Sequence, residues 1–173
     1  QGLSPLERAR AAAGFGHTTL SPLHGALIAA AIARGGLMPQ PILVQDVRVP
    51  DGAPPVVVPS PSVWLRSMSS EVAAELTAMM EAAVKDGTAS REFAPDKRPA
   101  HLMGVPIAGK TGSLSSSGSE RFHFSWFVGF APSDNPRVAL AVLMINRPAW
   151  RLKALPVARA AFAALLQEEG VER

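Results

Sequence analysis

Apolar residues recur at the three- and four-residue spacing of a helix in three long segments of the chain. The first begins after Ser21-Pro22, where serine suits the N-cap and proline the first helical position, and it ends at Gly35-Gly36. The second runs from Ser69 or Ser70 to Lys85, and the third from Leu155 or Pro156 to Glu169. We also expect a short helix around Leu3 to Ala13.

Three segments in the second half of the chain have the pattern of β-strands. Val105 to Ser113, Phe122 to Ala131 and Arg137 to Ile145 are separated by short polar connections at 115–119 and 132–136. Connections this short predict an antiparallel meander. The third segment is apolar without alternation, so we expect it to be buried on both faces, with helices covering both sides of the sheet.

Together these elements predict an α+β fold, with helices, a three-stranded antiparallel sheet and a final helix. A length of 173 residues suits one domain or a large part of one. Residues 39–61 are rich in proline, with a β-like run at 56–58. We interpret them as an extended excursion across the surface, because the parts on either side are too short to be good separate domains. Residues 88–106 are predicted to be a loop.

Composition narrows the classes of function. The net charge is +3 without any block of like charges, which argues against a nucleic-acid partner. There is no cysteine, and the four histidines lack the spacing of metal ligands, so we expect neither a metal site nor a cofactor. No apolar run reaches the roughly 18–20 residues of a membrane span. Since no signal-peptide pattern follows Gln1, we expect any targeting or anchor segment to lie upstream of it.

The densest group of chemically useful side chains lies on the first predicted strand. Ile107 to Ser113 contains a lysine, two hydroxyls and two glycines within seven residues. Lys110, Thr111 and Ser113 can bind an anion, and Gly112 leaves room for a ligand near the backbone. The sequence therefore predicts a binding site along this strand.

Several motifs occur in an order that carries a family resemblance. They are Gly14-Phe15-Gly16 before the Ser21-Pro22-Leu23 helix start, the helix end Ala29 to Gly36, Gly87-Thr88-Ala89, Gly109 to Ser113 with its Lys-Thr-Gly, Trp126 to Pro132, and Leu155 to Ala158. Together they resemble the C-terminal half of a penicillin-binding protein transpeptidase domain, most like the class B type. The resemblance spans most of the chain. It implies a five-stranded sheet in the complete fold, with three strands in this chain.

Two signature elements of that family are missing from the expected places. The family's nucleophile lies in Ser-x-x-Lys, and Ser67-Met68-Ser69-Ser70 does not match it. Ser133-Asp134-Asn135 contains Ser-x-Asn, but it follows the Lys-Thr-Gly strand, so we interpret it as a turn. The resemblance implies that residues 1–173 are the C-terminal part of a single transpeptidase (penicillin-binding) domain. The N-terminal part with the nucleophile is then not in this chain.

The resemblance also implies roles and surroundings. Lys110 and Ser113 would be catalytic, and Lys110, Thr111, Gly112 and Ser113 would bind the substrate carboxylate and the reacting carbonyl. Implied partners are peptidoglycan stem peptides, β-lactams, the missing N-terminal half of the domain and cell-wall synthesis proteins. The implied location is the extracytoplasmic (periplasmic) face of the bacterial inner membrane, with the anchor in an upstream segment.

Two other functions stay open at this level. A serine β-lactamase of the class D type shares Lys-Thr-Gly and a similar following strand, and a non-catalytic β-lactam sensor or scaffold would bind without cross-linking. One consequence is common to all of these alternatives. Without the family's two N-terminal strands, the apolar third strand has an open edge, so we expect the chain alone to be marginally stable or to dimerise through it.

Overall fold

The computed structural model describes residues 2–12, 14, 19–44, 60–116, 121–147 and 152–168. Its elements, in chain order, are α1 (Pro5–Ala12), α2 (Pro22–Ala33), β1 (Leu37–Pro39), β2 (Val63–Arg66), α3 (Ser70–Lys85), the 3₁₀ turns η1 (Pro95–Lys97) and η2 (Ala100–Leu102), β3 (Ala108–Ser115), β4 (His123–Ala131), β5 (Val138–Asn146) and α4 (Ala154–Glu168). The predicted α+β class is confirmed, and the predicted helices and main strands fall within a few residues of these bounds.

Strands β3, β4 and β5 form the central sheet, in that order and antiparallel throughout. The ladder between β3 and β4 is continuous and pairs Thr111 with Phe127. The next ladder continues it and pairs Phe127 with Val142. The meander predicted from the short connections is therefore confirmed.

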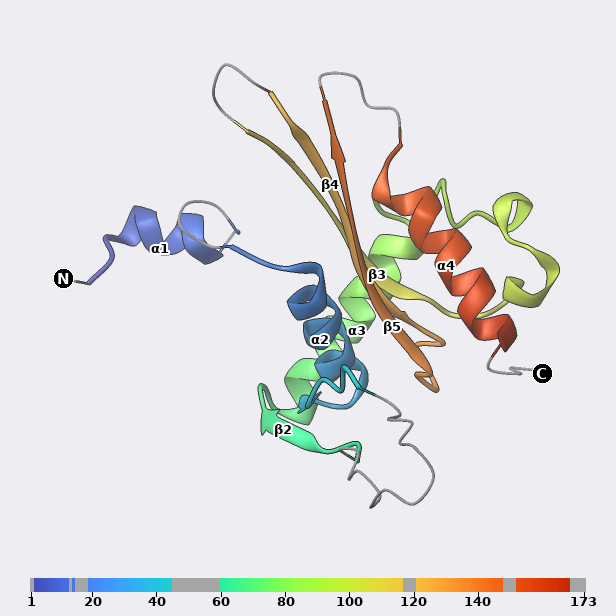
Figure 1. Ribbon diagram of the computed structural model, residues 1–173, viewed down its shortest axis with the longest axis horizontal. Helices are drawn as coiled ribbons and strands as arrows, with labels where there is room; N and C mark the ends of the chain where they lie inside the picture. The colour runs from blue at the N-terminus through green and yellow to red at the C-terminus, as the bar shows by residue number, and fades with distance from the viewer. Residues whose placement is uncertain are drawn as a thin grey trace, which may run out of the picture.

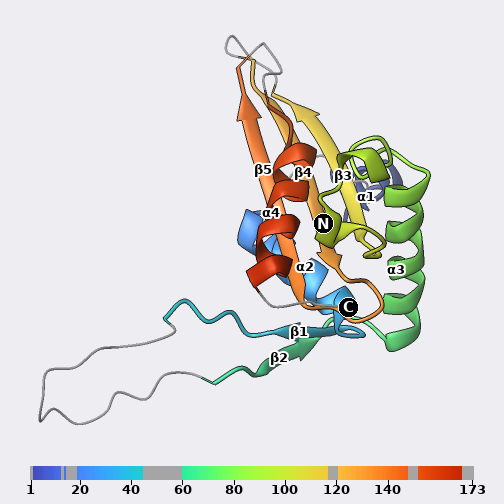
Figure 2. The same ribbon diagram turned by 90° about the vertical axis from the view of Figure 1, so that its right-hand side faces the viewer.

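Helices cover both faces of this sheet. Helix α4 lies against one face and α2 against the other, while α3 runs beside β3 (Figures 1 and 2). Helix α1 stands apart from these layers and buries none of its residues (Figure 1). The layered arrangement leaves β3 at one edge of the sheet and β5 at the other.

An aromatic cluster fills the space between the sheet and α4. The rings of Phe93, Phe127 and Phe162 are almost fully buried, and their centroids lie 5.5 to 6.5 Å apart. Phe127 and Phe162 meet edge to face, an arrangement that adds about 0.5–1.5 kcal/mol beyond the area buried. The cluster joins β4, α4 and the segment after α3 into one core.

The opposite face packs through small residues. Ser21 caps α2 by accepting a hydrogen bond from the His24 backbone N–H at 3.1 Å. Gly25 then lets the helix approach the sheet, because a Cβ at this position would stand 3.1 Å from Cβ of Ala141. Further along, Ile32 packs with Phe130 in a second buried cluster that also contains residues of α3 and β3.

The burial of β5 differs from the sequence prediction. We expected this strand to be buried on both faces, but in it only Leu140 and Asn146 are buried, and Ile145 is 56% exposed. The physical reason is its position, since β5 has a neighbouring strand on one side only within the described residues. Its apolar sequence therefore borders solvent along one edge.

Two short strands that the sequence did not reveal lie on either side of the proline-rich region. Strands β1 and β2 pair antiparallel, with an irregularity between Met38 and Pro39. Every residue of β2 is exposed, so its sequence lacks the alternation of buried and exposed positions by which a strand can be predicted. The predicted β-like run at 56–58 lies outside the described residues. Likewise, the segment 88–106 is not wholly irregular, because it contains η1 and η2.

Candidate functional site at the edge of strand β3

The four predicted site residues lie in sequence along β3, at the edge of the sheet. Lys110 and Ser113 are exposed, and Thr111 and Gly112 are half-buried. Side chains alternate along a strand, so Thr111 and Ser113 share one face while Lys110 and Gly112 share the other. The hydroxyl pair and the ammonium therefore flank the strand from two sides.

Lys110 is held close to its own backbone. Its Nζ donates a hydrogen bond to the Thr111 carbonyl oxygen at 2.9 Å. The side chain is exposed, so an arriving anion can replace this weak local contact at little cost. The lysine is thus available as a positive charge beside the strand.

The glycines on this strand have two different explanations. A Cβ on Gly109 would lie 2.2 Å from Cζ of Phe127, and a Cβ on the facing Gly129 would lie 2.9 Å from the same ring. These two glycines make room for Phe127 rather than for a ligand. At Gly112 a Cβ would stand 3.3 Å from Cβ of Trp126, which is tight but tolerable contact.

The strand also has a neighbour that sequence reasoning had not assigned to the site. The hydroxyls of Thr88 and Thr111 lie 2.6 Å apart, and either can be the donor. Thr88 follows α3, and its side chain is exposed. The sequence singled out Gly87-Thr88-Ala89 as a motif but carried no sign of this contact, because the two threonines are 23 residues apart.

The backbone on both sides of Thr88 is fixed. Before it, Gly87 packs against the end of α3 so closely that a Cβ would lie 2.8 Å from Cα of Ala83. After it, Ala89 is 1% exposed, and its N–H donates to the Ala83 carbonyl at 3.2 Å. The hydroxyl of Ser90 closes the turn by donating to the Gly87 carbonyl at 2.8 Å. Thr88 is therefore presented from a rigid turn.

An ionic network ties the following segment to α4. Glu92 accepts hydrogen bonds from Lys97 and from Arg159, each at 3.1 Å. Burial of the Glu92 carboxyl opposes its ionisation, but the hydrogen bonds from these two cations outweigh it and hold the pKa of Glu92 below its ordinary value. The Arg159 guanidinium also donates to the Lys97 carbonyl at 2.8 Å.

A second arginine closes the same segment from within. Arg98 donates to the carbonyl of Phe93 at 2.6 Å and to that of Val105 at 2.9 Å. Both carbonyls belong to the segment between α3 and β3, so one side chain links an inner residue of this segment to a residue near its end. The segment that carries Thr88 is consequently held in two ways, by contacts with α4 and by this internal link.

The turn after β4 has a structural role, as predicted. Ser133 is 9% exposed, its N–H donates to the Pro106 carbonyl at 2.8 Å, and its hydroxyl donates to the Glu81 carboxylate of α3. These contacts place Ser133-Asp134-Asn135 at the end of the sheet away from Ser113, between β4 and β5. The interpretation of this Ser-x-Asn as a turn is confirmed.

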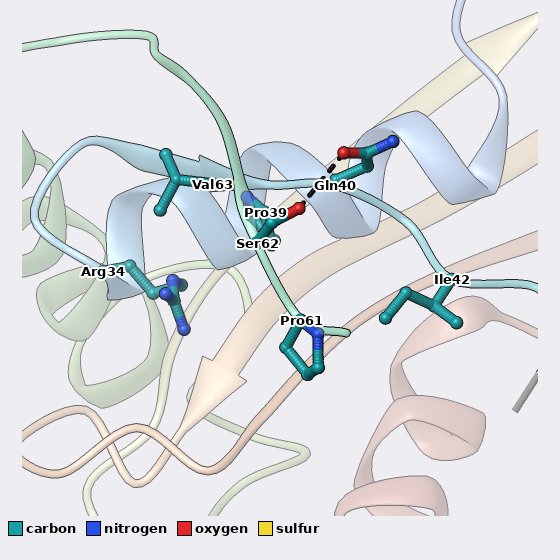
Figure 3. A pocket seen from close by; sticks show the side chains of 7 residues that line it. All are labelled: Arg34, Pro39, Gln40, Ile42, Pro61, Ser62 and Val63. Carbon is teal, nitrogen blue, oxygen red and sulfur yellow. Dashed lines mark hydrogen bonds between the residues drawn. The ribbon is translucent and has the colours of Figure 1, made fainter. Parts of the chain in front are cut away.

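A pocket elsewhere in the molecule is separate from β3. It has a volume of about 290 Å³ and lies beside β1 and β2. Among the residues that line it, Gln40 accepts a hydrogen bond from the Ser62 hydroxyl at 3.1 Å, and Arg34 also belongs to the lining (Figure 3). Mostly proline and aliphatic side chains surround these polar groups, so the pocket offers little chemistry beyond binding.

The part of the chain that the structure describes holds neither a cluster of metal-ligating side chains nor a membrane-spanning helix. No three histidine, aspartate or glutamate side chains gather there as metal ligands do. Within the same ranges, none of the helices combines the length and the apolar character that crossing a membrane requires.

Comparison with known protein families identifies the family of this chain. The family model "Penicillin binding protein transpeptidase domain" matches residues 2–167. The chain belongs to this family. The resemblance that the sequence motifs indicated is thereby confirmed.

Relatives and solved structures agree with this assignment. The peptidoglycan D,D-transpeptidase PbpA of Mycolicibacterium smegmatis is 36% identical over 86% of this chain, and that of Mycobacterium tuberculosis is 38% identical over 87%. The imipenem acyl-enzyme complex of penicillin-binding protein A from M. tuberculosis superposes with a TM-score of 0.72, at 36% identity over 89% of this chain and 32% of that one. The chain spans about 30% of the length of these PbpA relatives.

Proposed function

We propose that this chain supplies the Lys-Thr-Gly strand of a peptidoglycan D,D-transpeptidase that forms a serine acyl-enzyme and binds β-lactams. The observation that carries the proposal is the exposed edge of β3, with Lys110, Thr111 and Ser113 along it, in a chain of the penicillin-binding transpeptidase family. Relatives named as D,D-transpeptidases, and acyl-enzyme complexes with imipenem and penicillin G, support this function over a β-lactamase or a sensor.

The residues of β3 have different roles in the proposed reaction. Thr111 and Ser113 project from one face of the strand and bind the terminal carboxylate of the donor peptide through their hydroxyls. Lys110 supplies positive charge on the other face, beside the nucleophile and its proton-transfer network. The backbone N–H of Ser113 is one hydrogen-bond donor to the oxyanion. Gly112 has no side chain and so leaves room for the ligand beside the strand.

The nucleophilic serine comes from an N-terminal part of the same domain. Its hydroxyl attacks the carbonyl of the D-Ala-D-Ala bond, the terminal D-Ala leaves with a proton, and an acyl-enzyme remains. The amine of a second stem peptide then attacks that acyl carbonyl and releases the serine. We place this reaction on the extracytoplasmic side of the bacterial inner membrane, with an anchor upstream and other cell-wall synthesis proteins as partners.

The test replaces the charge on β3 in the complete protein, the gene product that includes the nucleophile. Lys110→Ala is expected to lower the second-order rate of acylation by a penicillin by about 100-fold or more, on the scale of losing one stabilising group in the active site. Lys85→Ala is the matched control, because Lys85 is an exposed lysine at the end of α3. Acylation by Lys110→Ala at the parent rate would contradict the assignment of this strand.

A further inference from the structure

We infer that Thr88 is a positioning residue for Thr111, and that its hydroxyl prepares the Thr111 hydroxyl to receive a carboxylate. The inference rests on the proposed function, because the carboxylate belongs to the proposed substrate. Its starting point is the distance of 2.6 Å between the two hydroxyl oxygens, which lies within the range of an O–H···O hydrogen bond.

The direction of this hydrogen bond follows from what Thr111 must do. A hydroxyl has one hydrogen to donate and two lone pairs to accept with. If Thr111 donates its hydrogen to a carboxylate, then it can meet Thr88 only as an acceptor, and Thr88 must donate. The resulting chain, from Thr88 to Thr111 to carboxylate, polarises both hydroxyls in the same sense and strengthens the bond to the anion.

The second part of the argument is rotational order. The side chain of a threonine on a sheet edge can turn its methyl group or its hydroxyl toward a ligand. A partner within hydrogen-bond distance selects the rotamer in which the hydroxyl of Thr111 lies beside Thr88. That partner is effective because the turn around Thr88 is rigid, held by the close approach of Gly87 to Ala83 and by the buried Ala89.

Thr88 therefore acts on binding without touching the substrate. Ser113, on the same face of β3, makes no side-chain hydrogen bond to the described part of the chain. Of the two hydroxyls assigned to the carboxylate, Thr111 is thus the one with a partner that fixes its orientation. The expected consequence is that the initial, non-covalent complex weakens when Thr88 loses its hydroxyl, while the acylation step itself changes little.

The experiment measures acylation of the complete protein by a penicillin, with the dissociation constant of the first complex and the acylation rate constant determined separately. Thr88→Val keeps the branched shape and removes the hydroxyl. We expect it to raise the dissociation constant about three- to tenfold, as for one ordinary hydrogen bond, and Thr88→Ser to restore the parent value. Thr77→Val is the matched control, because the Thr77 hydroxyl donates within α3, to the Ala73 carbonyl.

Two further readouts separate positioning from a structural effect. The methyl ester of the same penicillin lacks the carboxylate, so Thr88→Val should bind it as the parent does. The double variant Thr88→Val/Thr111→Val should be no worse than Thr111→Val alone, because Thr88 acts through Thr111. An equal loss with the ester, an additive double variant, or no change for Thr88→Val would overturn the inference. If the parent is not acylated at all, then the proposed function fails instead.

Discussion

Two glycines face each other across β3 and β4, beside the ring of Phe127. Gly109 and Gly129 are paired in the ladder, and neither has space for a Cβ on the side of the ring. Phe127 in turn contacts Phe93 and Phe162 in the main core. Gly109, the first glycine of the Gly-Lys-Thr-Gly segment, is therefore required for packing. The sequence pattern alone does not distinguish a glycine needed for packing from one that leaves room for a ligand.

Replacing Gly109 by alanine should strain this core. The new Cβ would overlap the Phe127 ring, which has no free space to move into because it is fully buried. We expect Gly109→Ala to lower the free energy of unfolding by about 1–3 kcal/mol, measured by urea denaturation. Gly112→Ala, on the same strand but with its Cβ 3.3 Å from Trp126, should lose clearly less. Equal losses for the two variants would show that the ring is not the cause.

At the scale of single residues, the contact between Thr88 and Thr111 could not be predicted from the sequence. Lys110, Thr111 and Ser113 are recognisable because they are neighbours within one motif. Thr88 belongs to another motif and meets them only through the course of the chain between α3 and β3. Nothing in its own neighbourhood of the sequence specifies the partner of its hydroxyl.

At the scale of elements, periodicity predicted the helices and the meander because these follow local spacing rules. Burial of a side chain depends on which elements pack against it in the folded protein, and the spacing of apolar residues does not indicate these. Met79 and Met80 are neighbours in α3, yet Met80 is 8% exposed and Met79 is 61% exposed. Likewise β5 has the composition of a central strand but lies at an edge of the sheet. Strand β2, which is exposed throughout, has no such pattern.

The segment between α3 and β3 should become less stable in acid through Glu92. Its pKa is lowered in the folded protein, so its stabilising effect is present above the ordinary value of 4.5 and is lost as the pH falls through the folded-state pKa. Glu92→Gln should cost about 1 kcal/mol at neutral pH, and its deficit should shrink below about pH 4.5. Exposed Glu75→Gln serves as the control in the same pH series of unfolding measurements. A deficit that stays constant down to pH 3 would argue against the ion pairs.

The open edge of β5 leads to a prediction for the 173-residue chain by itself. An apolar edge strand is a site for pairing with another chain, and a lysine on such an edge prevents pairing. We expect sedimentation to show a dimer that Ile145→Lys dissociates, since Ile145 is 56% exposed on β5. Leu6→Lys, on the separate helix α1, should leave the dimer intact. A stable monomer in the parent would contradict this use of the edge.

At the scale of the whole molecule, the candidate site consists of binding groups along the edge of a single strand, β3. Lys110, Thr111 and Ser113 offer charge and hydroxyls along an exposed edge, but no Ser-x-x-Lys occurs anywhere in the 173 residues. Family membership and the 30% coverage of the PbpA relatives fit a division in which the nucleophile comes from another part of the domain. Binding groups and reacting group would then meet only when both parts pack together.

This division predicts a difference between the chain and the complete protein toward a penicillin. Incubated alone with an excess of the antibiotic, the 173-residue chain should keep its intact mass, because its serines lack the adjacent lysine that activates the family's nucleophile. The complete protein should gain the mass of one penicilloyl group on a serine outside these residues. Hydroxylamine treatment, which cleaves acyl esters, should remove it. A penicilloyl adduct on the chain alone would place the nucleophile within residues 1–173 and refute the division, whichever serine carried it.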